Sequence, residues 1–292
     1  LRLVREGTLA LRPDQIPAAS TITRILQRHD QWEPKVPGPG ADTATQRFER
    51  PQANALWQMD FKGEFPLRNQ QPCYPLTLLD DHSRFDLGLR ACANMHRTTV
   101  QQALTAIFRR YGLPEALLID NGAPWGSGIR DAANRPYYTT LGVWWMRLGI
   151  RVIHSRPRHP QTHGKNERFH GTLHAELLRY EQFRDLAQAQ DRFDWWRHRY
   201  NHERPHQALD DQVPSDRYTP SPRELPTTLP SIEYGPDDAV RRVDSSGKIS
   251  LQGTKYKIGR AFCRLPVAVR PQVDTAASMV YFCHQPIREI GG

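Results

Sequence analysis

Hydrophobic and polar positions alternate strictly in residues 57–62, where Trp57, Met59 and Phe61 are separated by polar side chains. This period of two predicts a strand with one buried face, and it directs Asp60 away from that face. Similar runs predict further strands at 74–79 and 85–91. Residues 116–119 are wholly apolar and bounded by turn residues, which predicts a short strand at the centre of a sheet. A short strand is also expected at 152–153.

Helical spacing of apolar residues marks three other regions. In the first, Thr98 and Gln101 form a potential capping box, and Gly112 and Pro114 end the pattern. Its apolar face comprises Val100, Ala103, Leu104, Ile107, Phe108 and Tyr111. The second predicted helix covers 137–148, and a third helical region begins at Pro160. Strands and helices that alternate in this way predict an α/β fold for residues 52–212.

The remaining chain divides into an amino-terminal segment, a carboxy-terminal domain and two linkers. Residues 1–31 hold a short amphipathic helix with Ile22, Ile25 and Leu26 on one side, which suits part of a helix-turn-helix. Residues 32–51 are an aperiodic linker, and the six prolines within 213–236 predict a second one. Residues 237–292 contain short β-like runs punctuated by glycines, which predicts a small all-β barrel.

The composition favours an anionic partner. The formal net charge is +9, and six Lys or Arg residues lie between Arg147 and Arg168 against a single acid, Glu167. Such clustering is typical of contacts to a phosphate backbone, although a solvated basic face would also produce it. The four cysteines form no CxxC pair, so we expect reduced thiols in a cytoplasmic protein. Neither a signal peptide nor a membrane-spanning run is expected from the sequence.

Three carboxylates stand out within these basic surroundings. Asp60 and Asp120 each end an apolar run, and Glu167 lies on the predicted helix opposite its apolar stripe of Phe169, Leu173, Leu177 and Tyr180. Three acids brought together repel one another unless a cation compensates them. Mg²⁺ or Mn²⁺ would meet this need, with two ions acting on a phosphodiester. Taken singly, each acid could be an ordinary strand-edge, turn or helix-surface residue.

The motifs that carry these acids resemble those of DDE transposases of the retroviral-integrase-like superfamily, which includes bacterial insertion-sequence transposases. They are Trp-Gln-Met-Asp at 57–60, Ile-Asp-Asn-Gly at 119–122 and Pro-Gln-Thr-His-Gly-Lys-Asn-Glu-Arg at 160–168. The segment 200–209 resembles the end of the same domain. The resemblance implies a ribonuclease-H-like mixed sheet in which Asp60, Asp120 and Glu167 bind two metal ions. It also implies cleavage at transposon ends, strand transfer into target DNA, and at least a homodimer associated with the bacterial nucleoid.

Residues expected at the DNA are basic or polar and lie beside Glu167 or on the amino-terminal helix: Lys165, Arg168, His163, Asn166, Arg156, Arg158, Thr21, Thr23 and Arg24. The 46 residues between Asp120 and Glu167 exceed the spacing of compact relatives, and the excess falls in 124–140. This insert is either a mobile loop or a contact surface. Asp80 and Asp81 are rival acids that we interpret as turn residues. The histidines lack a zinc pattern, so no zinc site is expected.

Two other classes of protein remain possible on this sequence. A DNA-binding regulator would keep the fold without turnover, and it would have no need to hold like charges together. A structure-selective nuclease would hydrolyse DNA without joining strands.

Overall fold

The computed structural model describes residues 12, 15, 17–29, 49–130, 136–155, 164–273 and 276–291, in two units, Leu1–Phe48 and Glu49–Gly292. Helix α2 (Ala19–Arg28) belongs to the first unit and carries the predicted apolar stripe. Ile22, Ile25 and Leu26 are 41%, 45% and 37% exposed. The helix is thus confirmed, whereas a helix-turn-helix stays a prediction. Of the linker predicted at 32–51, residues 32–48 lie outside the described residues.

A six-stranded mixed sheet forms the centre of the second unit. Its strands are β1 (Trp57–Phe61), β2 (Phe65–Pro66), β3 (Pro72–Asp80), β4 (Asp86–Cys92), β5 (Ala116–Ile119) and β8 (Arg151–His154). The order is β2-β3-β1-β5-β8, with β4 also pairing with β3. β1, β3 and β4 pair antiparallel, while β1, β5 and β8 pair in parallel. This is the mixed sheet expected of a ribonuclease-H-like core.

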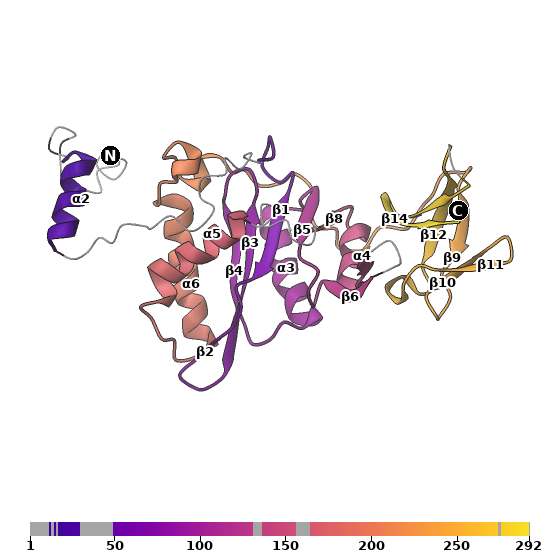
Figure 1. Cartoon of the computed structure of the whole chain (residues 1–292), viewed down its shortest axis with the longest axis horizontal. Coiled ribbons are helices and arrows are strands. Elements are labelled where there is room, and N and C mark those ends of the chain that lie inside the picture. Colours follow the sequence, from indigo (N-terminus) through magenta and orange to yellow (C-terminus); the bar gives the residue numbers. More distant parts are fainter. Residues whose placement is uncertain are drawn as a thin grey trace. The chain divides into compact units, whose positions relative to one another are not determined.

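Helices cover both faces of this sheet (Figure 1). On one face, α3 (Arg97–Tyr111) and α4 (Thr140–Arg147) share a core with Trp57, Met59 and Leu117. On the other, α5 (Gly164–Leu173), a π-helical turn at His174–Leu178 and α6 (Leu186–His202) pack with Leu79 and Leu89. The fold is therefore a three-layer α/β/α arrangement.

Burial on both faces corrects the prediction for β1. Gln58 is only 2% exposed, like its apolar neighbours Trp57 and Met59, so the strand is covered on each side. The polar position is accommodated because the Gln58 amide donates to Asp81 Oδ1 at 2.6 Å. Alternation in a sequence therefore does not distinguish a solvent-facing polar residue from one that is buried and hydrogen-bonded.

Three helix predictions also need correction. The apolar face of α3 is confirmed residue by residue, but the helix begins at Arg97 after an N-cap His96 without a side-chain cap, so Thr98 is not the start of a capping box. The helix predicted at 137–148 begins at Thr140, after strand β7 (Pro136–Tyr138). Tyr180 was predicted in the core and is 72% exposed. The π turn at 174–178 adds a residue per turn, and the α-helical periodicity used for the prediction does not continue past it.

The carboxy-terminal residues form antiparallel β-structure, as predicted, while the closure of these strands into a barrel stays a prediction. A four-stranded antiparallel sheet has the order β14-β13-β12-β9, from β9 (Ala239–Arg242), β12 (Pro266–Pro271), β13 (Ser278–Phe282) and β14 (Gln285–Ile290). β10 (Lys248–Leu251) and β11 (Thr254–Lys257) form a separate hairpin. Among the described residues, short 3-10 turns lie at Gln207–Leu209, Pro214–Asp216 and Arg260–Phe262.

The proline-rich segment before this domain is attached to the core. Tyr218 stacks on Phe85 with ring centroids 4.3 Å apart, and Asn54 donates to the carbonyl of Thr219 at 2.8 Å. The Arg223 guanidinium donates to the carbonyls of Pro114, Leu148 and Gly149. The segment therefore connects the α/β core with the carboxy-terminal β domain while it is itself attached to the core. No helix in the described ranges combines the length and apolar character needed to cross a bilayer.

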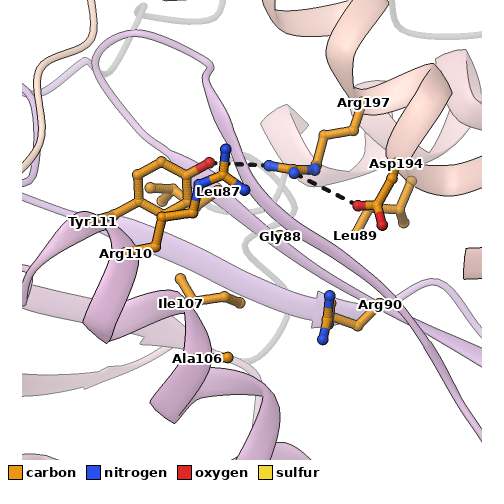
Figure 2. Close-up of a pocket in the computed structure, with 10 residues that line it drawn as sticks. All are labelled: Leu87, Gly88, Leu89, Arg90, Ala106, Ile107, Arg110, Tyr111, Asp194 and Arg197. Carbon is orange, nitrogen blue, oxygen red and sulfur yellow. Dashed lines mark hydrogen bonds and ion pairs between the residues drawn. The ribbon is translucent and has the colours of Figure 1, made fainter. Parts of the chain in front are cut away.

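A small cavity of about 130 Å³ lies between β4, α3 and α6 (Figure 2). Arg197 donates to the Tyr111 hydroxyl at 3.1 Å and lies 3.6 Å from the Asp194 carboxylate. Neither Asp60, Asp120 nor Glu167 lines this cavity. Arg197 here supports the packing of three elements.

Because Asp86 is buried beside Arg197, we predict that the free energy of unfolding depends measurably on pH. Asp86 is 0% exposed, and burial raises its pKa to about 7, against the opposing effect of Arg197. The native state therefore binds a proton that the unfolded state has released, and this group's contribution falls as the pH rises from about 4 to about 7. Asp86→Asn should remove this fall, which at about 1.4 kcal/mol per pKa unit is on the order of 4 kcal/mol over the whole range.

Urea unfolding of both proteins at pH 5 and pH 8 measures the effect. The wild type should lose more stability between the two values than Asp86→Asn, while Asp194→Asn, at a half-exposed site, should follow the wild type. Equal losses in wild type and Asp86→Asn would show that Asp86 titrates normally.

Candidate active site

The register of two parallel strands brings the first two predicted acids together. Trp57 pairs with Leu117 and Gln58 with Leu118, a constant offset along β1 and β5. Continuing this offset places Asp60 beside Asp120, where adjacent strands lie about 4.8 Å apart. Both carboxylates are half-buried at the carboxyl end of β5, the sheet edge at which α/β enzymes gather their sites.

The electrostatics of Asp60 reflect its neighbours. Burial first, then the Asp120 carboxylate and to a smaller extent Glu167, raise the pKa of Asp60 to about 7, against a backbone hydrogen bond from Phe61. The charges of Asp120 and Glu167 therefore both act on the Asp60 carboxyl group. A cation bound beside this group would favour its charged form and lower the pKa again.

A tight turn after β5 fixes Asp120. Oδ1 of Asp120 accepts the Gly122 N–H at 2.9 Å and also the Trp125 indole Nε1–H. A Cβ at Gly122 would stand 3.0 Å from the Asp120 Oδ2, so glycine keeps that oxygen clear. Asn121 supports the turn, as predicted, because its amide donates to the Ser155 carbonyl at 2.9 Å.

Helix α5 carries Glu167 in its first turn, where the side chain is exposed. The helix is joined to β1 through His170 and Thr77. The Thr77 hydroxyl donates to the Asp60 carbonyl at 3.0 Å, so it accepts from His170 Nε2–H at 2.9 Å. Burial, and then Lys62, lower the pKa of His170 to about 4, which keeps this ring neutral. The link fixes α5 one turn beyond Glu167.

The three groups suit a divalent cation such as Mg²⁺ because all are carboxylates, whose oxygens are the ligands that this ion prefers. The pKa of Asp60 is also raised by burial and by its negative neighbours, and a cation would offset their charge. Across the described residues, however, no three His, Cys, Asp or Glu side chains are grouped closely enough to share one ion. Of the two neighbouring acids, Asp120 has the larger effect on the pKa of Asp60 and Glu167 the smaller.

The residues predicted at the DNA have different surroundings. Arg156, Arg158 and His163 lie outside the described residues. Arg168 is exposed on α5, while Thr21 and Arg24 are exposed and Thr23 is half-buried on α2. Asn166 is 0% exposed, so the structure does not support the DNA contact predicted for it. Lys165 pairs with buried Asp81 at 2.5 Å.

Sequence reasoning missed three residues that shape this site: Trp125, His170 and Asp81. Asp81 lies in the turn after β3, as predicted, whereas Asp80 is the last residue of that strand and accepts from Ser83 and Asn54. The role of Asp81 beneath α5 was not predicted. Trp125 had a usable signal, since a tryptophan follows the Asp-Asn-Gly turn after only two residues, and a buried indole N–H needs an acceptor.

Matches to protein families identify the class of the chain. Two models of the integrase core domain match residues 50–160 and 148–214, over the sheet and helices described above. The chain thus contains an integrase core domain within residues 50–214. Residues 238–291 match the C-terminal domain of IS481 family transposases.

Two insertion-element proteins are similar to this chain in sequence. An uncharacterised 39.2 kDa protein of IS476 from Xanthomonas euvesicatoria is 31% identical over 159 residues, covering 53% of this chain and 41% of that protein. An uncharacterised 31.7 kDa protein of IS407 from Burkholderia multivorans is 27% identical over 163 residues, covering 56% and 54%. The chain therefore spans about half the length of the curated relatives it matches.

Solved structures with similar coordinates include viral integrases. A chain in the structure of the simian T-cell lymphotropic virus intasome in complex with PP2A regulatory subunit B56 gamma is 17% identical, with a TM-score of 0.49 over 84% of this chain and 82% of that one. The catalytic core domain of BIV integrase is 18% identical, with a TM-score of 0.41 over 56% and 92%.

Proposed function

We propose that this chain binds transposon-end DNA and catalyses metal-dependent cleavage of phosphodiester bonds, followed by strand transfer into target DNA. Asp60, Asp120 and Glu167 are its catalytic carboxylates in this proposal. The observation that carries it is the raised pKa of Asp60 under the charges of both Asp120 and Glu167, at strand ends that the parallel register of β1 and β5 directs toward each other.

The proposal assigns a distinct task to each protein group. Asp60 and Asp120 supply oxygen ligands from rigid strand ends, and Glu167 supplies a third from the first turn of α5. When bound there, two Mg²⁺ or Mn²⁺ ions would activate the attacking hydroxyl and stabilise the leaving oxygen. His170, held neutral, fixes the helix against β1 and takes no proton at neutral pH.

DNA is the proposed substrate because the surroundings of these acids are basic. Arg168 is exposed next to Glu167, and the exposed residues Arg241, Arg242 and Lys257 add positive charge on the carboxy-terminal strands. Such side chains would engage phosphates independently of base sequence. We further propose a homo-oligomer, since pairing two transposon ends requires at least two active sites.

Labelled end DNA incubated with the chain and a divalent cation tests this function. We expect nicked and joined products with Mg²⁺ or Mn²⁺, and their complete loss with EDTA while DNA binding persists. Metal-dependent hydrolysis without joining would favour a nuclease instead. Binding with no cleavage under any metal condition would favour a DNA-binding regulator.

A further inference from the structure

Trp125 occupies the gap between the two acidic strand ends. Its side chain is 2% exposed and stacks on Phe61, the residue after Asp60, with centroids 5.2 Å apart and planes 9° from parallel. Its Nε1–H donates to Oδ1 of Asp120. One indole ring thus contacts the β1 end by stacking and the β5 end by a hydrogen bond.

The same hydrogen bond assigns separate roles to the oxygens of Asp120. Oδ1 accepts from both Trp125 and Gly122, whereas Oδ2 faces Gly122. A carboxylate with two donors on one oxygen has a fixed orientation and retains its second oxygen for another ligand. Groups that hold a ligating carboxylate in this way strongly affect metal affinity.

Trp125 is itself held by later residues of the 124–140 insert. Its carbonyl accepts from the Thr139 hydroxyl at 3.1 Å, and Gly126 pairs with Tyr138 across the hairpin of β6 (Gly126–Arg130) and β7. A Cβ at Gly126 would overlap the Asn121 carbonyl, so the hairpin lies directly against the Asp120 turn. The position of Trp125 thus depends on where this hairpin is fixed.

The hairpin is fixed by the carboxy-terminal domain. The Tyr138 hydroxyl accepts from Gln285 Nε2 at 2.8 Å, and its ring packs edge-on against Phe262. Gln285 is 5% exposed and also bonds both the N–H and the carbonyl of Val152 on β8. Tyr137 adds contacts to Lys257 and Arg288, with the cations 5.1 and 4.1 Å from its ring centroid.

We propose that Trp125 is a positioning residue for the divalent-cation site, and that the carboxy-terminal domain sets its position through the β6–β7 hairpin. The inference rests on the proposed function, because the cation site is the one assigned to Asp60 and Asp120. In this proposal the 124–140 insert is a contact surface. Through it, the position of the carboxy-terminal domain determines the position of the Asp120 carboxylate in the core.

Trp125→Phe separates this role from simple packing. Phenylalanine keeps an aromatic ring against Phe61 but removes the N–H donor to Asp120 together with the second ring of the indole. We expect a thermal midpoint close to that of the Trp145→Phe control and an affinity for Mn²⁺ roughly tenfold weaker than that of the control, measured on the full chain by electron paramagnetic resonance of the free ion. Trp145→Phe is the matched control, because Trp145 is also buried but its Nε1 has no hydrogen-bond partner among the described residues.

Tyr138→Phe tests the link to the carboxy-terminal domain, since it removes only the hydroxyl that Gln285 contacts. We expect a weakening of Mn²⁺ affinity of about threefold, and little further loss when it is combined with Trp125→Phe, as for residues that act in series. Full additivity of the two losses would show that the hairpin does not act through Trp125.

Asp120→Asn distinguishes failure of this inference from failure of the proposed function. If Asp120→Asn loses Mn²⁺ binding while folded Trp125→Phe retains wild-type affinity, the positioning role is wrong and the metal site stands. If Asp120→Asn also binds Mn²⁺ as the wild type does, the proposed site itself is wrong, and Trp125 positions nothing catalytic.

Discussion

Glu167→Gln is expected to reduce DNA cleavage and strand transfer by at least about 10³-fold while leaving DNA binding and stability unchanged. The substitution keeps the size of the side chain and removes the negative charge with which Glu167 would complete the cation site. Glu167 is exposed in the first turn of α5, so the change disturbs no packing. Single-turnover assays with labelled end DNA measure the loss, and fluorescence anisotropy measures binding.

Glu203→Gln is the matched control for this experiment. Glu203 follows α6, is exposed, and pairs with Arg199 at the surface, away from β1 and β5. It should cleave and join DNA at the wild-type rate. Turnover by Glu167→Gln within a few fold of the control would remove Glu167 from the catalytic set, whatever the behaviour of Asp60 and Asp120.

Two of the three acids could be located from the sequence because their positions follow from local patterns. Asp60 and Asp120 each end an apolar run, and parallel pairing of those runs leaves little freedom in where the carboxylates lie. The apolar face of α3 was predictable for the same reason, since a regular helix repeats its contacts. In a regular helix or strand, the spacing of residues along the sequence determines which side chains share a face.

Features that depend on contacts between distant segments could not be predicted in this way. Gln58 looks solvent-facing in the strand pattern, and only Asp81 on the β3–β4 turn explains its burial. The π turn at 174–178 leaves no mark in the apolar spacing, so Tyr180 was placed in the core. The docking of the insert depends on Gln285, which is far away in the chain.

Lys165 has a partner within the protein that its sequence motif does not indicate. Beside Glu167 in a basic run, Lys165 was predicted to contact DNA phosphates. In the structure its Nζ lies 2.5 Å from Oδ1 and 3.0 Å from the carbonyl of Asp81, which is 0% exposed. Burial, and then Arg84, lower the pKa of Lys165 to about 8 against the opposing effect of Asp81. The amine is therefore mainly protonated at pH 7, and it ties the start of α5 to the sheet.

Lys165→Met is accordingly expected to destabilise the protein by about 3 kcal/mol, because it leaves the buried Asp81 carboxylate without its cation. The two roles for Lys165 predict opposite results. An ion pair under α5 predicts a large loss in urea unfolding at pH 7 and little change in DNA affinity at fixed salt. A phosphate contact predicts unchanged stability, weaker DNA binding and a shallower salt dependence.

The double variant Lys165→Met/Asp81→Leu completes the test. Removing both charges takes away the unpaired carboxylate, so the double variant should lose clearly less stability than the sum of the two single losses. Lys248→Met, at an exposed position on β10, controls for the loss of a surface charge. Additive losses for Lys165 and Asp81 would mean that the two side chains are not energetically coupled and that their ion pair does not stabilise the start of α5.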